Sequence, residues 1–118
     1  MAQKYIVNDI VMYKNRIHTI IDILASNGYE LSYVRHQVSP VRLSGVPLTP
    51  EILEKNGWAK DKEGYINDSY HLHLCEKNNR YSVYKVVNDN IVWLTDVKNV
   101  SDLQHLLFGL GLNSEMEV

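Results

Sequence analysis

All three prolines of this 118-residue chain lie between residues 39 and 50, in the segment SPVRLSGVPLTP. Proline fixes φ and has no backbone N–H to donate, so a segment with three prolines resists pairing within a sheet. The segment therefore predicts a connector that divides the chain into residues 1–45 and residues 46–118. A chain of this length buries roughly two thirds of its unfolded surface, which is enough to fold without disulfides or metal.

The first part has the alternating pattern of short strands. An apolar run over residues 10–13 is followed by a β-branched stretch over residues 16–25. Residues 29–35 then alternate, with Tyr29, Leu31 and Tyr33 on one face. Lys14 and Asn15 favour a two-residue turn, and the Ser-Asn-Gly sequence at residues 26–28 is a stronger turn signal. The pattern predicts a small, curled antiparallel sheet similar to an SH3-like barrel.

The second part begins with the signals of a short helix. Thr49 is a favourable N-cap, Pro50 suits the first helical position, and Gly57 suits the C-terminal stop. A helix of two turns is unstable alone, so we expect it to dock through its apolar residues. These are Leu48, Ile52, Leu53 and Trp58.

Three strands are predicted next, at residues 70–75, 80–87 and 91–95, as an antiparallel meander. The polar segment 59–69 is expected to be a loop or an irregular edge strand. A helix is predicted over residues 101–112, with Ser101 and Gln104 as a capping box and a frayed tail after it. Its apolar stripe consists of Leu103, Leu106, Leu107 and Leu110.

These elements predict an α+β fold: an SH3-like β module over residues 1–45 and a helix-meander-helix part over residues 46–118. We expect the two parts to pack as one compact unit. The predicted core consists of Ile17, Ile21, Ile23, Leu31, Leu48, Ile52, Leu53, Leu72, Leu74, Val92, Leu94, Leu103, Leu106, Leu107 and Leu110.

Two segments resemble a known group of proteins. The segment VPLTPEILEKNGW at residues 46–58 resembles a PLTPEIL segment, followed by Gly and an aromatic residue, in short uncharacterised proteins of Bacteroides-type bacteria, their phages and mobile elements. Residues 100–110, VSDLQHLLFGL, resemble the LQ-x-L-x-F helix that closes many of those proteins, although Ser101 and Asp102 replace the usual His-Gln pair. The resemblance implies phage or mobile-element cargo in a bacterial cytoplasm, and it implies no catalytic residues.

One set of side chains suggests a metal site. His71, His73 and Cys75 alternate with Leu72 and Leu74, so on a strand they would share one face, and imidazole and thiolate are zinc ligands. The alternative is that the leucines face the core and the other three face solvent or a partner. No fourth ligand has a diagnostic spacing, so we expect no metal, and these three residues remain weak candidates.

The sequence contains no phosphate-binding glycine loop, no dinucleotide fingerprint and no nucleophile elbow. Its paired carboxylates occur only in predicted loops. We therefore expect a non-enzymatic protein without a cofactor.

Charge is unevenly divided between the two parts. Residues 1–45 carry five Lys/Arg against three Asp/Glu, whereas residues 46–118 carry seven against eleven. A basic β module with Tyr29, Tyr33 and Arg35 could stack bases, so nucleic-acid binding is one alternative. The acidic part, with Tyr81, Tyr84 and Trp93, suits a protein partner, because Tyr and Trp are enriched at interface hot spots.

The strand at residues 80–87 has apolar residues on both faces. This pattern predicts a sheet covered by a helix on one face and by the N-terminal module or a second copy on the other, so a homodimer is possible. The expected function is an accessory protein that acts through protein–protein contacts. A second alternative is an anti-defence protein that sequesters a host protein or a nucleotide signal.

The single cysteine, Cys75, excludes an intramolecular disulfide and fits a reducing compartment. Apolar runs are too short to span a bilayer, and the first residues lack the pattern of a secretory signal. We therefore expect a protein of the bacterial host's cytoplasm that does not bind membranes.

Overall fold

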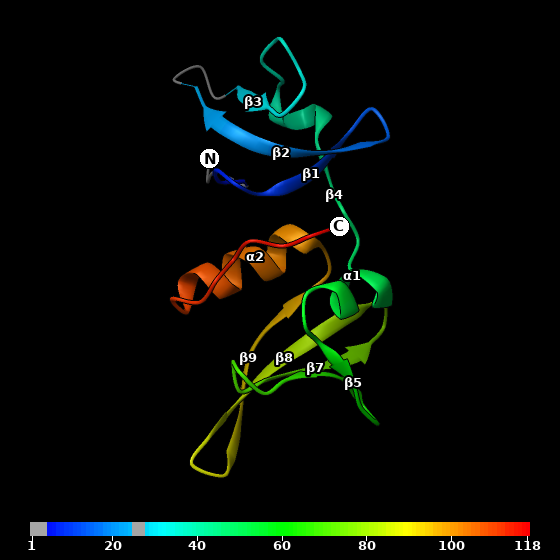
Figure 1. The fold of residues 1–118 in the computed structure, drawn as a ribbon, viewed down its shortest axis with the longest axis vertical. Helices are drawn as coiled ribbons and strands as arrows, with labels where there is room; N and C mark the ends of the chain where they lie inside the picture. Colours follow the sequence, from blue (N-terminus) through cyan, green and yellow to red (C-terminus); the bar gives the residue numbers. More distant parts are fainter. Residues whose placement is uncertain (1–4, 25–27) are drawn as a thin grey trace.

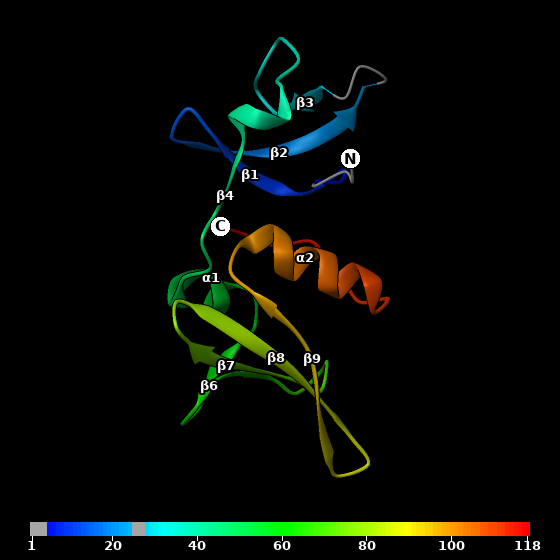
Figure 2. The ribbon, with the colours of Figure 1, turned by 180° about the vertical axis from the view of Figure 1, so that it is seen from behind.

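The computed structural model describes residues 5–24 and 28–118, and within them two antiparallel sheets lie on either side of one helix (Figure 1). The molecule measures 48 × 25 × 24 Å, and its long axis runs from one sheet to the other. The same arrangement is seen from behind in Figure 2. The predicted α+β class is confirmed at this level.

The N-terminal sheet has four strands in the order β3-β2-β1-β4. They are β1 (Ile10–Tyr13), β2 (Arg16–Ile23), β3 (Tyr29–Leu31) and β4 (Ser44–Gly45). A 3-10 helix, η1 (Pro40–Arg42), precedes β4, and an isolated bridge pairs Tyr29 with Val38. The proline segment thus contains a helical turn and a very short edge strand. The turn predicted at residues 26–28 lies mostly outside the described residues.

Strand β2 buries the face opposite to the one predicted. His18 and Ile20 are buried, and His18 Nδ1 hydrogen-bonds with the Ser32 carbonyl at 2.7 Å. Ile17 and Ile21 are 44% and 51% exposed. Both residues share a face with Ile10 of β1, but the helix that covers this face packs over β1 and leaves β2 open.

Helix α1 (Pro50–Lys55) forms as predicted. The Ile52 N–H donates to Thr49 Oγ1 at 3.3 Å, and Gly57 has the left-handed φ of 85° that ends the helix. The four predicted docking residues, Leu48, Ile52, Leu53 and Trp58, are all buried.

The second sheet has five strands in sequence order, where three were predicted. They are β5 (Ala59–Lys60), β6 (Gly64–Asn67), β7 (Leu72–Lys77), β8 (Arg80–Val87) and β9 (Asn90–Val97). Residues 59–69, expected to be a loop or an irregular edge strand, therefore largely form a hairpin with β5 at the edge of the sheet. Asp61 closes this hairpin by accepting from the backbone N–H groups of Glu63 and Gly64. The hairpin of β8 and β9 extends past the helices, which leaves Val92 exposed instead of in the core.

Helix α2 (Val100–Gly109) begins one residue earlier than predicted and uses a different cap. Asn99 is the N-cap, and Asp102 accepts from the Asn99 backbone N–H at 2.9 Å. The predicted cap residues Ser101 and Gln104 are buried. Leu110 lies beyond the helix and is exposed, whereas the tail is not frayed, because Asn56 and Glu117 exchange two hydrogen bonds of 2.8 Å.

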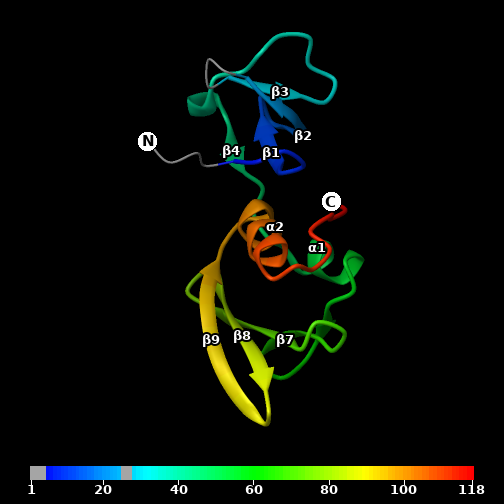
Figure 3. The ribbon, with the colours of Figure 1, turned by 90° about the vertical axis from the view of Figure 1, so that its left-hand side faces the viewer.

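Helix α2 packs between the two sheets (Figure 3). Val100, Leu103 and Leu107 share one apolar cluster with Leu72 and Leu74 of the five-stranded sheet, and Ile10 of β1 belongs to the same cluster. The next residue on β1, Val11, lies in a second cluster within the N-terminal sheet. Strand β1 is therefore buried on both faces, and the N-terminal sheet lies beyond α2 instead of covering the far face of the meander.

No helix in the described part of the chain is both long enough and apolar enough to span a membrane.

Candidate functional site: an uncovered aromatic row and a basic cavity

The face of the meander opposite the helices carries a row of partly exposed side chains. Strand register places Ile66 beside His73, His73 beside Tyr84, and Tyr84 beside Trp93, so the row crosses β6, β7, β8 and β9. Leu74 and Val83, which point to the other face, are fully buried under the helices. We call these four residues the Trp93 row.

Trp93 is held in place although it is 56% exposed. Its indole N–H donates to Asp96 Oδ1 at 3.1 Å, and the Ser82 hydroxyl donates to the same oxygen at 2.7 Å. Arg80 lies 3.9 Å from the other carboxylate oxygen. These hydrogen bonds lower the pKa of Asp96, so the carboxylate that holds the indole stays ionised. An aromatic side chain fixed in this way loses less entropy when a partner binds.

The structure separates the three weak metal candidates. His71 has a φ of 56° in the turn before β7, so it is not on the strand with His73 and Cys75, contrary to the prediction. Among the described residues, no group of three or more His, Cys, Asp or Glu could hold a metal ion. Burial, together with the charges of Glu63 and Asp61, raises the pKa of the Cys75 thiol, which disfavours the thiolate needed for metal binding or nucleophilic attack.

The other candidate aromatic residues differ in exposure. Tyr29 and Tyr81 are buried, each edge-to-face with another tyrosine (Tyr5 and Tyr65), so they are core residues and not surface contacts. Tyr33 is fully exposed in a turn after β3, and Arg35 is exposed two residues later. Of the predicted binding residues, Tyr84 and Trp93 are brought side by side by strand pairing.

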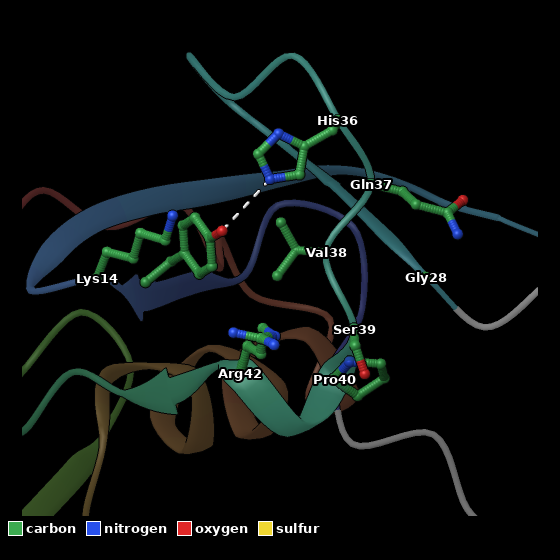
Figure 4. A pocket seen from close by; sticks show the side chains of 9 residues that line it. Lys14, Gly28, His36, Gln37, Val38, Ser39, Pro40 and Arg42 are labelled. Atoms are coloured by element: carbon green, nitrogen blue, oxygen red, sulfur yellow. Dashed lines mark hydrogen bonds between the residues drawn. The ribbon is translucent and has the colours of Figure 1, made fainter.

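A cavity of about 640 Å³ opens on the N-terminal sheet, beside the turn between β1 and β2 (Figure 4). Tyr13 and Val38 form its buried part, and Lys14, His36 and Arg42 lie exposed around it. Sequence reasoning missed this cavity because the three basic residues come from separate segments. The signal that could have found it is the lysine placed in a tight turn.

In comparisons with models of protein families, with curated proteins and with solved structures, no significant match to this chain was found.

A buried set of hydrogen bonds connects the N-terminal sheet to α2. Asp9 is 1% exposed, its carboxylate accepts from the Ile6 N–H at 2.9 Å, and it lies 2.6 Å from His105 Nε2. Gln104 accepts from the Ile10 N–H at 2.9 Å and donates to the Asn8 carbonyl at 3.0 Å. The pair of Asp9 and His105 resembles the orienting half of a catalytic triad, but its contacts join the segment before β1 to the helix, so we interpret it as structural.

Stability should depend on the ionisation of Asp9. Burial raises the pKa of Asp9, and the nearby charge of Asp102 adds to this, although the hydrogen bonds from Ile6 and His105 oppose it. The folded state therefore favours the protonated form of Asp9. This stabilises the fold fully below the ordinary pKa of an aspartic acid, and the stabilisation is lost as pH rises through the pKa of Asp9 in the folded state.

The matched variant is Asp9→Asn, which cannot ionise. Urea unfolding between about pH 3.5 and pH 7 should show that the wild-type free energy of unfolding, relative to the variant, decreases as pH rises. An increase over that range would contradict the assignment of Asp9 as a carboxyl group whose burial disfavours its charge.

Proposed function

We propose that this chain is a non-enzymatic accessory protein that binds a protein partner through the Trp93 row. The observation that carries the proposal is the row itself: an indole held by Asp96 beside Tyr84, on a sheet face that the helices leave uncovered. Rigid aromatic side chains surrounded by polar groups are typical of interface hot spots. Arg80 and Asp96 supply polar groups at the edge of the row.

Charge favours a protein over a nucleic acid on this face. The row itself carries no lysine or arginine, and the nearby Arg80 lies against Asp96. Residues 46–118 carry seven Lys/Arg and eleven Asp/Glu, so this part of the chain has a net negative charge and would be repelled by the same part of a second copy. We therefore propose a different protein as the partner, with an apolar contact region and a basic surround.

The resemblance of residues 46–58 and 100–110 to phage and mobile-element proteins supports a setting in the cytoplasm of a Bacteroides-type host. We also propose an SH3-like barrel for the N-terminal sheet. Its support is the 3-10 helix η1 directly before β4, which returns to pair with β1, and the bridge from Tyr29 to Val38.

The test uses purified wild-type protein and two variants to capture proteins from a host lysate. Trp93→Thr removes the exposed indole and keeps a residue suited to a strand. Phe108→Thr is the control, because Phe108 is also an exposed aromatic residue but lies on α2. We expect one stoichiometric partner that wild type and the Phe108 variant retain and the Trp93 variant loses.

The partner is then purified and titrated by calorimetry. Truncation of a hot-spot tryptophan weakens binding by about 30-fold or more. Equal affinity for wild type and Trp93→Thr would overturn the proposal. So would a concentration-dependent dimer of the wild type in light scattering that Trp93→Thr abolishes, because the row would then bind a second copy.

A further inference from the structure

The cavity on the N-terminal sheet has a chemistry different from that of the Trp93 row. None of its nine lining residues is acidic, whereas Lys14 and Arg42 are cationic and His36 offers an imidazole. Figure 4 shows the three basic side chains around Val38. A concave surface lined by one sign of charge concentrates counter-ions, so this cavity favours an anionic ligand.

The backbone of the turn that holds Lys14 is strained. Its φ is 48° and that of Asn15 is 63°, so the turn between β1 and β2 requires two residues in the left-handed region. The two other hairpins with such turns use Asn78–Asn79 and Asn88–Asp89, residue types that tolerate this conformation. Lysine is disfavoured there by about 1 kcal/mol, and such strain concentrates at functional positions.

The Tyr13 ring contacts both Lys14 and His36 and holds their side chains in place. Lys14 Nζ lies 5.4 Å from the centroid of the Tyr13 ring, which positions the ammonium group by a cation–π contact. The Tyr13 hydroxyl and His36 Nε2 are joined by a hydrogen bond of 3.3 Å, and the two rings are edge-to-face. His36 is therefore held with its exposed ring at the entrance of the cavity.

The side chains around the cavity suit the phosphate and the base of a nucleotide. The Arg42 guanidinium can bind a phosphate with two parallel hydrogen bonds, and Lys14 adds a point charge. The cavity of about 640 Å³ has room for an organic portion beside a phosphate. Exposed rings such as that of His36 stack on the flat faces of bases.

We propose that this cavity binds a nucleotide unit, with the phosphate on Lys14 and Arg42 and the base against His36. The unit can be a free mononucleotide or part of a single strand, since both present the same phosphate and base. This site lies on the N-terminal sheet and is independent of the Trp93 row on the other sheet.

The test is a calorimetric titration with four probes: adenosine 5′-monophosphate, adenosine, inorganic phosphate and a six-residue oligodeoxyadenylate. We expect the monophosphate to bind more tightly than adenosine or phosphate alone. An oligonucleotide that binds more tightly still identifies a strand as the source, and in that case log K should fall against log salt with a slope of about −0.7 for the one phosphate that Lys14 and Arg42 neutralise. Weaker binding of the oligonucleotide identifies the free nucleotide.

Two variants separate binding from folding. Arg42→Gln and Lys14→Asn should each lower the affinity for adenosine 5′-monophosphate by about tenfold. Lys14→Asn should also raise the melting temperature, because asparagine suits the turn. Lys62→Asn is the matched control, an exposed lysine in the bend between β5 and β6. Absence of saturable binding by both nucleotide probes, or an equal loss with Lys62→Asn, would overturn the proposal. Trp93→Thr should leave nucleotide affinity unchanged, so the two proposals can fail separately.

Discussion

Replacing Gly64 by alanine should lower the free energy of unfolding by about 3 kcal/mol. A Cβ atom at this position would lie 2.0 Å from the Leu74 carbonyl oxygen and 3.2 Å from Cys75 Cα. Both neighbours are backbone atoms of β7, so no side-chain rotation can relieve the clash. Strand β6 would have to move away from β7, and it would carry the buried Tyr65 with it.

Urea unfolding followed by tryptophan fluorescence measures this effect, because Trp58 is buried. The control is Gly109→Ala, at the end of α2, where an added Cβ meets nothing within 4 Å. Alanine in a helix is favoured over glycine by about 0.5–1 kcal/mol, so the control should be neutral or slightly stabilising. If Gly64→Ala were as stable as the control, the close pairing of β6 and β7 would be wrong.

Replacing Leu103 by alanine should be about as damaging, at roughly 3 kcal/mol. Leu103 is fully buried on α2, in the cluster that includes Ile10 of β1 and Leu72 and Leu74 of the second sheet. The lost methyl groups would leave a cavity between the two sheets. Because that cavity borders both sheets, we expect one cooperative transition at lower urea and not the separate unfolding of one half.

Phe108→Ala is the control on the same helix. Its side chain is 65% exposed, and exposed substitutions usually change stability by about 0.5 kcal/mol or less. Equal unfolding free energies for Leu103→Ala and Phe108→Ala would show that α2 does not pack as described. Two separate transitions in the Leu103 variant would show that the sheets are not coupled through the helix.

Local chemistry was predicted well from the sequence. Thr49, Pro50 and Gly57 act within a few residues of one another, and they define α1 without reference to the rest of the chain. The turn predicted at Lys14 and Asn15 is also local: both residues have a positive φ, which asparagine tolerates and lysine does not favour.

Features that depend on a distant partner were predicted poorly. On β2, alternation shows two faces, but only the position of α2 decides that Ile17 stays exposed. The predicted capping box of Ser101 and Gln104 does not form, because Gln104 instead bonds with Asn8 and Ile10, more than 90 residues earlier. Gly64 has no side chain to mark a strand, so the register with Cys75 could not be inferred.

The candidate sites show the same division. Tyr84 and Trp93 were chosen as interface residues, and strand pairing places them together. Tyr29 and Tyr81 had the same composition signal, yet burial removes them from the surface. Lys14, His36 and Arg42 line one cavity in the fold, and their spacing in the sequence does not indicate that they lie close together.

The position of α2 between the sheets also affects how the chain is made. This helix is the last regular element in the sequence, yet Ile10, near the start, depends on it for burial and for a hydrogen-bond partner 94 residues away. Contacts between such distant residues slow folding, because a long loop must close before they form. During synthesis, the apolar face of β1 therefore stays open to solvent and to chaperones until α2 has left the ribosome.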